Sequence, residues 1–334
     1  MKICVVGAGA IGGYMAVRLA HAGHQVSVIA RGPHLAAIRA RGLKLVEAEQ
    51  ELVAGDLAAT DRIRDLGPHE LVLLALKAHQ IAAVVDDLPV LFGADSVVVT
   101  LQNGIPWWYF QKLGGEYAGR VVETVDPGGV LLGAVDPDRI IGCIAYPAAI
   151  VAEPGVIRHV EGNRFPLGEL DGSLSDRVRS VSEVFAGAGF KSRVLEDIRS
   201  EIWLKLWGNL TFNPISALTH ATLVDICRFP GTRKLATAMM TEAQAVGERL
   251  GAGFRVPLER RIAGAESVGK HKTSMLQDVE AGKPLEVDGM LGVVVELAEM
   301  TGVEVPTLRA IHACVSLLNE TMQSEGLRIR GAPR

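Results

Sequence analysis

The first twelve residues contain a glycine pattern typical of nucleotide binding. Gly7-Ala8-Gly9-Ala10-Ile11-Gly12 has the spacing G-x-G-x-x-G, directly after the β-branched run Lys2–Val6 and before helical spacing in Tyr14–Ala22. The first glycine permits a tight turn, the second lets the backbone approach a pyrophosphate, and the third lets the helix pack on the strand. The helix N-terminus adds N–H donors and the positive end of a dipole. We therefore predict a dinucleotide site that includes Gly7, Gly9, Ala10, Ile11 and Gly12. The alternative is a glycine-rich turn without a ligand.

The end of the second predicted strand indicates which dinucleotide is bound. NAD sites usually carry a carboxylate there, which binds the ribose 2′-hydroxyl. Here Gln25–Ala30 is followed by Arg31 and Gly32, and a guanidinium can bind a 2′-phosphate through charge-assisted hydrogen bonds. The sequence therefore predicts NADP (NADPH) as the cofactor, with Arg31 in its site. The alternative is a solvated arginine without cofactor preference.

Two polar residues follow later apolar runs that are typical of strands in a parallel sheet. Lys77 comes directly after Leu71–Leu76, and Asn103-Gly104 follows Val97–Leu101. Open α/β sheets bind ligands beyond the carboxyl ends of their strands. Lys77 is therefore either a cofactor contact or a solvated loop charge. Asn103 is either a donor to a substrate or nicotinamide oxygen or part of an ordinary Asn-Gly turn.

A polar stripe runs through an otherwise apolar segment in the second half of the chain. In E-I-W-L-K-L-W-G-N-L-T-F-N-P, Lys205, Asn209 and Asn213 recur every four residues, which puts all three on one helix face. Trp203 and Trp207 flank the lysine. A charged group and two amides on one stripe are unusual for a simple solvent face. The polar face of an amphipathic helix is the alternative.

Ser274 and Glu286 lie near predicted helix ends in the last third of the chain. T-S-M-L-Q-D precedes a Gly-Lys-Pro break, after which L-E-V-D-G opens another helix. Glu286 fits helix-start electrostatics by itself, and Ser274 fits a helix serine that bonds back to its own backbone. Neither residue indicates a catalytic role in isolation.

The elements that must position these residues begin with a sheet. Strand, turn, helix and strand at the N-terminus form a β-α-β unit. Between residues 121 and 170, short β-rich pieces alternate with Asp-Pro, Pro-Gly and Gly-Asn turns: Ile140–Ile150, Val156–His159 and Arg164–Leu167. This alternation of short β-rich segments and turns predicts antiparallel strands that extend the sheet.

From Glu196 onward the β-rich patterns almost vanish. Helical spacing occurs in Glu201–Thr211, Thr232–Leu250, Leu258–Glu280, Leu285–Met300 and Thr307–Met322, with glycine or proline breaks between them. The predicted fold class is α/β, in three parts. Residues 1–194 form a Rossmann-type NADP-binding domain with an antiparallel extension, residues 195–325 an all-α domain, and residues 326–334 a tail.

The composition excludes several classes of protein. The 334 residues are 49 per cent hydrophobic and 22 per cent charged, as in a globular chain and unlike a disordered one. A formal net charge of −4 gives no global positive field for nucleic acid or an anionic membrane. The longest uncharged apolar run, Ile140–Ala152, is well short of the ~20 residues that cross a bilayer. No signal peptide is indicated, and without a C-x-x-C pair no metal site is indicated either. We therefore expect a cytoplasmic protein.

Taken together, these segments resemble the ketopantoate reductase family, the 2-dehydropantoate 2-reductases, from Met1 to about Met322. The resemblance rests on G-A-G-A-I-G, Leu76-Lys77-Ala78, Gln102-Asn103-Gly104, the E-I-W-L-K-L-W-G-N segment, and T-S-M-L-Q-D with L-E-V-D-G. It implies a Rossmann domain and a helical substrate and catalytic domain, with NADPH and a small 2-oxo acid meeting in the cleft. The implied reaction is ketopantoate to pantoate, in coenzyme A biosynthesis.

The resemblance also implies roles for single residues. Lys205 would be the general acid that protonates the ketone oxygen as hydride arrives from nicotinamide C4. Glu286 would help to position that lysine and the hydroxyl end of the substrate, and would contact the cofactor. Ser274 would bind the substrate carboxylate. The remaining polar residues would contact substrate, nicotinamide or the rest of the cofactor: Asn103, Asn209, Asn213, Lys77 and Arg31.

The chain departs from the family pattern around the substrate. His271 stands where the family commonly has an asparagine, so it either replaces an amide donor or is a surface histidine, and Trp107-Trp108-Tyr109 is bulky. Polar groups discriminate strongly only when they match those of the substrate. The alternatives are therefore reduction of a different branched or aromatic 2-oxo acid, or an NADPH-sensing protein without turnover. An apolar helical domain is compatible with a homodimer.

Overall fold

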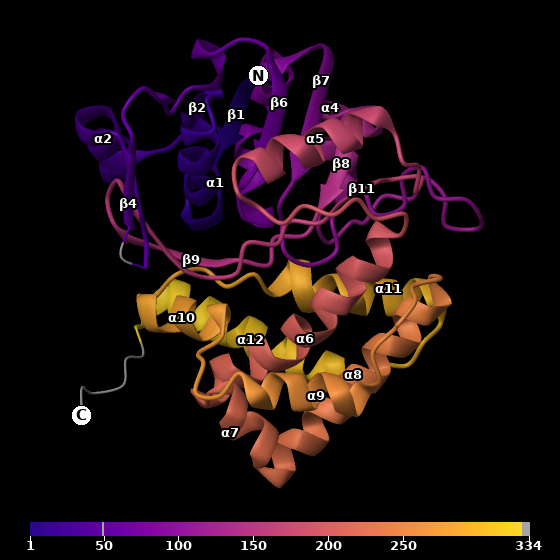
Figure 1. Cartoon of the computed structure of the whole chain (residues 1–334). Coiled ribbons are helices and arrows are strands. Elements are labelled where there is room, and N and C mark those ends of the chain that lie inside the picture. Colours follow the sequence, from indigo (N-terminus) through magenta and orange to yellow (C-terminus); the bar gives the residue numbers. More distant parts are fainter. Residues whose placement is uncertain (49, 329–334) are drawn as a thin grey trace. The chain divides into compact units, whose positions relative to one another are not determined.

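The computed structural model describes residues 1–48 and 50–328, apart from the side chains of Ala78 and His79. Contacts divide the chain between Ile198 and Arg199 into two compact units. The first contains the sheets and the second is helical (Figure 1). Most of the expected tail, residues 329–334, lies outside the described residues. No helix in the described part is long and apolar enough to span a membrane.

A seven-stranded sheet forms the centre of the first unit as described (Figure 1). Its order is β11 (Leu167–Glu169), β8 (Ile140–Cys143), β7 (Phe92–Thr100), β6 (His69–Leu74), β1 (Lys2–Val6), β2 (Gln25–Ile29) and β5 (Ala58–Thr60). All neighbours are parallel except β11, which is antiparallel to β8. The chain order reverses at β1, and such a switch point is where open α/β sheets bind ligands. The predicted Rossmann-type fold is confirmed.

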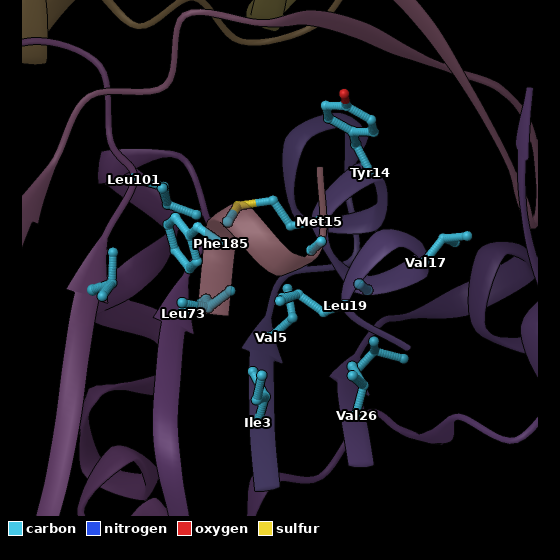
Figure 2. Close-up of a cluster of buried hydrophobic side chains, with 14 of the residues drawn as sticks. Ile3, Val5, Tyr14, Met15, Val17, Leu19, Val26, Leu73, Leu101 and Phe185 are labelled. Atoms are coloured by element: carbon cyan, nitrogen blue, oxygen red, sulfur yellow. The ribbon is translucent and has the colours of Figure 1, made fainter. Parts of the chain in front are cut away.

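Three helices contribute to the apolar core on one face of this sheet: α1 (Ala10–His21), α2 (Gly32–Arg41) and α5 (Asp176–Gly187). Because successive strand residues point to opposite faces, Ile3 and Val5 of β1 lie on this face together. Figure 2 shows them with Leu73 of β6, Met15 of α1 and Phe185 of α5. This layer holds α1, and with it the glycine-rich turn, against the sheet.

The β-rich pieces expected to extend this sheet are divided between two sheets. β8 and β11 join the large sheet, but β9 (Ala148–Glu153) and β10 (Val156–Glu161) belong to a second one, with the order β4-β3-β10-β9. Its other strands are β3 (Leu43–Glu47) and β4 (Gln50–Ala54). The prediction is wrong for β9 and β10 because Ile157 pairs with Leu45 and packs on α1 at Gly13, where a β-carbon would clash with it.

The other elements of the first unit are short. They are the 3-10 helices η1 (Ile63–Asp65), η2 (Ala82–Leu91), η3 (Pro127–Gly129) and η4 (Pro137–Arg139), and the helices α3 (Ala78–Ile81) and α4 (Val130–Ala134).

The described part of the second unit contains helices but no strands. Its helices are α6 (Ile198–Thr219), α7 (Leu223–Arg228), α8 (Pro230–Arg249), α9 (Leu258–Ser267), α10 (Ser274–Ala281), α11 (Val293–Thr301) and α12 (Pro306–Glu325), with a π-helical turn η5 (Asp288–Gly292) before α11. The first residue of α6, Ile198, lies in the first unit, where it packs on Gly142 and Gly168 of the sheet.

Three helix predictions need correction. α6 runs eight residues past Thr211 and through Pro214, because the buried Phe212 and Ile215 around the proline keep it packed. The single helix predicted for Leu258–Glu280 is two helices, α9 and α10, because Gly269 adopts a left-handed φ of +81° between them. The helix predicted from Leu285 contains the π-helical turn.

Candidate active-site residues

The glycines of the first turn each meet a different steric condition. Gly7 has a φ of +105°, and a β-carbon there would lie 2.8 Å from Leu76 Cδ2. At Gly12 a β-carbon would overlap the carbonyl oxygen of Gly7. Gly9 precedes Ala10, the first residue of α1, and it is exposed with nothing within 4 Å of where a β-carbon would be. The turn therefore presents open backbone at the N-terminus of a helix, as a phosphate group requires.

Four parallel strands end in one row at the carboxyl edge of the large sheet. Val6 of β1 pairs with Ile29 of β2 and with Leu74 of β6, and Leu74 pairs with Thr100 of β7. The predicted ligand residues of the first unit follow these ends: Gly7, Gly9, Ala10, Ile11, Gly12, Arg31, Lys77 and Asn103. The structure thus brings them to the same edge of the sheet.

Arg31 lies between β2 and α2. It is exposed and is the N-cap residue of α2, whose first turn contains no acidic residue. The positive end of this helix and the guanidinium therefore occur together without a neighbouring carboxylate in that turn. This local charge suits an anionic group such as a 2′-phosphate.

Gln102 belongs to the motif Gln102-Asn103-Gly104, but the sequence assigns it no role at this edge. Its Nε2 donates to the carbonyl oxygens of Leu74 (2.7 Å) and Leu76 (3.3 Å). It therefore fixes the segment before Lys77 against the segment that carries Asn103. Its buried Oε1 has no hydrogen-bond partner among the described residues. A glutamine beside an Asn-Gly pair gives no sequence signal for this role.

The polar stripe of α6 lies in the second unit. Lys205 and Asn209 are half-buried and Asn213 is buried. Trp203 and Trp207 are fully buried, and the indole N–H of Trp207 donates to the carbonyl oxygen of Met240 in α8 at 2.7 Å. The tryptophans thus anchor the helix in the core of its unit, which holds the stripe in a fixed orientation.

Two predicted substrate residues of the second unit meet in space. Asn213 Nδ2 lies 3.5 Å from Ser274 Oγ and 3.6 Å from Met290 Sδ. Ser274 is exposed and is the first residue of α10, so no earlier helical carbonyl is available for the back-bonded geometry considered above. Met290 comes from the π-helical turn, and its distance in sequence from Asn213 explains why sequence analysis missed it.

Glu286 directly precedes the helical segment that begins at Val287 and includes the π-helical turn. The segment is fixed just before it, because the Leu285 N–H donates to Asn319 Oδ1 at 2.9 Å. Single π-helical turns are frequent at functional sites. Glu286 is half-buried and stands at the start of a helix. This position is compatible both with a capping residue and with a catalytic one.

Arg261 of α9 brings a cation from another helix to α6. A β-carbon at Gly208 would lie 2.5 Å from Arg261 Nη2, so the guanidinium packs on the backbone next to Asn209. The residue stands in an ordinary amphipathic helix, and nothing in its sequence context marks it. The missing side chain at Gly208 makes room for it.

The residues that depart from the family pattern are tied to the core or the backbone. Trp107 and Trp108 are buried, and the Trp108 indole N–H donates to Thr100 Oγ1 of β7 at 2.8 Å. The backbone carbonyl of His271 accepts from the Leu223 N–H at 3.1 Å, and its side chain is half-buried. The tryptophans therefore belong to the packing of the sheet.

The fold defines a Rossmann-type protein with a helical C-terminal domain, and comparisons identify the family. Ketopantoate reductase PanE/ApbA matches residues 3–172, and its C-terminal domain family, Ketopantoate reductase PanE/ApbA C terminal, matches residues 197–319. The chain is 51% identical over 319 residues to the 2-dehydropantoate 2-reductase of Mesorhizobium japonicum, covering 95% of this chain and 98% of the relative.

Solved structures agree with this assignment. A protein from Ralstonia solanacearum MolK2 superposes with a TM-score of 0.92 at 37% identity, covering 96% of this chain and 98% of that one. The 2-dehydropantoate 2-reductase of Geobacter metallireducens GS-15 has a TM-score of 0.83 at 25% identity, covering 95% of this chain and 100% of that one. The chain therefore belongs to the ketopantoate reductase family.

Proposed function

We propose that this protein reduces 2-dehydropantoate (ketopantoate) to pantoate with NADPH. The observation that carries the proposal is the similarity, over nearly the whole chain, to a relative named 2-dehydropantoate 2-reductase. The strand-end row of the first unit would supply groups for the cofactor, and the polar side chains of the second unit would supply groups for an acid-catalysed step.

The first unit fits a nicotinamide dinucleotide. The open backbone at Gly9 and the N-terminus of α1 suit its pyrophosphate. Arg31 at the end of β2 suits the 2′-phosphate that distinguishes NADPH from NADH. Lys77 and Asn103 follow the ends of β6 and β7 and would contact the remainder. When bound, NADPH supplies the hydride.

The second unit supplies the acid in this proposal. Reduction of a ketone places negative charge on its oxygen, and the Lys205 ammonium would stabilise this charge and donate the proton. Glu286 would position the lysine and contact the cofactor and the hydroxyl end of the substrate. A positioned acid of this kind contributes ~10² to 10⁴ in rate.

Amide and hydroxyl donors of the second unit would bind the substrate. Asn213 Nδ2 and Ser274 Oγ are 3.5 Å apart, so one carboxylate could accept from both groups. Asn209 lies one helical turn before Asn213 on the same face of α6. Loss of the Asn213 or the Ser274 donor should therefore raise the KM of the oxo acid more than the KM of NADPH.

The test is NADPH oxidation with a panel of 2-oxo acids that includes ketopantoate and branched and aromatic members. We expect the highest kcat/KM with ketopantoate and a clear preference for NADPH over NADH. A higher kcat/KM with an aromatic 2-oxo acid would show that ketopantoate is not the preferred substrate. Equal kcat/KM with NADH and NADPH would contradict the cofactor assignment. Tight NADPH binding without turnover of any acid would indicate a sensor.

The homodimer stays a prediction, which sedimentation velocity tests.

A further inference from the structure

His34, in the first turn of α2, joins two backbone segments that are far apart in the sequence. The N–H of Gly155 donates to its Nδ1 at 3.0 Å, and its Nε2 lies 2.8 Å from the carbonyl oxygen of Ala8. A backbone N–H can only donate, so Nδ1 is the unprotonated nitrogen of a neutral ring. The ring proton is therefore on Nε2 and is donated to Ala8. Both Ala8 and Gly155 are buried.

The bond to Ala8 fixes the direction of the following backbone N–H. The Ala8–Gly9 peptide group is planar and trans, so its carbonyl and its N–H point in opposite directions. With the oxygen held on His34, the Gly9 N–H points away from the histidine. Gly9 is the N-cap residue of α1 and the most open glycine of the turn. Its N–H is one of the donors that a phosphate meets at a helix N-terminus.

The other side of the histidine is held by the second sheet. Gly155 lies in the turn between β9 and β10 with a φ of +81°, and its carbonyl oxygen accepts from the Lys44 N–H of β3 at 2.9 Å. Arg41, the last residue of α2, donates to the carbonyl oxygen of Pro154 at 3.0 Å. α2 is thus attached to this turn at both of its ends. The helix that carries His34 is therefore bonded to the second sheet on the side away from Ala8.

We propose that His34 is a positioning residue for the cofactor, which orients the Ala8–Gly9 peptide of the phosphate-binding turn and anchors it to the β9–β10 turn. The ligand served is the pyrophosphate of a dinucleotide. The inference rests on the proposed function, and it assigns the effect on the cofactor to the bond with Ala8 rather than to the bond with Gly155.

Two substitutions separate the bond to Ala8 from the bond to Gly155. In His34→Gln the terminal amide nitrogen falls near the place of Nε2, so the donor to Ala8 is kept. In His34→Asn the amide oxygen falls near the place of Nδ1, so only the acceptor for Gly155 is kept. We expect His34→Asn to raise the Kd of NADPH about tenfold, equivalent to about 1.4 kcal/mol. His34→Gln should stay within about threefold of the wild type, less than about 0.7 kcal/mol by the same conversion. Neither variant should change kcat at saturating NADPH.

The matched control is His21→Asn. Its ring Nε2 lies 3.1 Å from the carbonyl oxygen of Val53, which makes it another histidine bound to backbone in the same unit but not to the glycine-rich turn. Its Kd for NADPH should not change. Equal losses of affinity in His34→Gln and His34→Asn, or an unchanged Kd in His34→Asn, would overturn the inference.

The same NADPH titration distinguishes a folding defect, and a failure of the proposed function, from a failure of the inference about His34. If His34→Asn does not fold, a tenfold loss of NADPH affinity in a folded His34→Gln still overturns the inference, because that variant keeps the bond to Ala8. A wild-type protein that does not bind NADPH would overturn the proposed function as well. A wild type that binds NADPH beside an unaffected His34→Asn would overturn only the role of His34.

Discussion

The carboxyl edge of the large sheet and the polar face around α6 are built in different ways. At the edge, backbone groups that follow one another in the chain, from Gly7 and Gly9 to the N-terminus of α1, are joined by side chains such as Arg31 at the neighbouring strand ends. The polar face consists of side chains from separate elements: Lys205, Asn209 and Asn213 come from α6 and Ser274 from α10, and Met290 of the π-helical turn lies against Asn213. A contiguous backbone site suits a cofactor that many enzymes share, and dispersed side chains suit one substrate and one proton transfer. We therefore expect cofactor affinity and turnover to respond to different substitutions.

The largest effect should come from the polar face. Lys205→Ala removes the proposed acid, so kcat should fall at least ~10²-fold, the lower end for such a group. The Kd of NADPH, measured by fluorescence titration, should stay near that of the wild type. Lys234→Ala removes an exposed lysine of α8 and should leave both values unchanged. Nearly full turnover in Lys205→Ala would show that another group donates the proton.

The next effect belongs to the edge and separates the two dinucleotides. Arg31→Ala should cost about 1.5 to 3 kcal/mol of NADPH binding, as loss of a charged hydrogen bond usually does. The kcat/KM with NADH should change little, because NADH has no 2′-phosphate. Arg39→Ala is the control, since Arg39 lies on the same helix but donates to the carbonyl oxygen of Ala59. A parallel loss with both cofactors would contradict the assignment of Arg31.

A smaller effect should distinguish two glycines of the same turn. Gly9→Ala adds a methyl group into open space, so Tm should hold while NADPH affinity falls about tenfold, or about 1.4 kcal/mol, because the backbone can no longer approach the pyrophosphate. Gly12→Ala would overlap the carbonyl oxygen of Gly7 and should lower Tm as well. Unchanged NADPH affinity in a folded Gly9→Ala would place the phosphate elsewhere.

The smallest effect should lie at the opposite edge and change stability alone. His69 begins β6, and burial lowers its pKa, against the smaller opposite effect of its hydrogen bond with the Gly67 carbonyl. The unfolded chain therefore binds a proton more readily, and stability is lost as the pH falls through about 6.5, the ordinary pKa of histidine. In His69→Gln the difference in Tm between pH 7.5 and pH 5.5 should shrink, with the Kd of NADPH unchanged. An equal pH dependence in both proteins would contradict this cause.

The backbone site could be predicted from sequence and the side-chain site only in part. G-x-G-x-x-G after a strand specifies its own local geometry, and the apolar runs before Lys77 and Asn103 fix which edge these residues reach. The stripe of Lys205, Asn209 and Asn213 follows from helical spacing. The meeting of Asn213 with Ser274 and Met290 does not, because it depends on how α6, α10 and the π-helical turn pack.

The errors in the fold have a similar origin. The sequences of β9 and β10 predict strands but do not specify which strand each pairs with. Both belong to the second sheet, where Ile157 of β10 packs on α1. Helical spacing continues across Val268–Thr273. Spacing alone does not show that Gly269 adopts a φ of +81°, which breaks the helix there. His34 gave no sequence signal, because its two backbone partners lie in distant turns.

The most direct test of the division between the two regions is the NADPH affinity of the double variant Gly9→Ala, Lys205→Ala. Independent sites have additive effects to within about 0.5 kcal/mol. We expect the double variant to bind NADPH as Gly9→Ala does, because the lysine contributes to turnover and the glycine to cofactor binding. A binding free energy that differs from that of Gly9→Ala by clearly more than this amount would contradict the division.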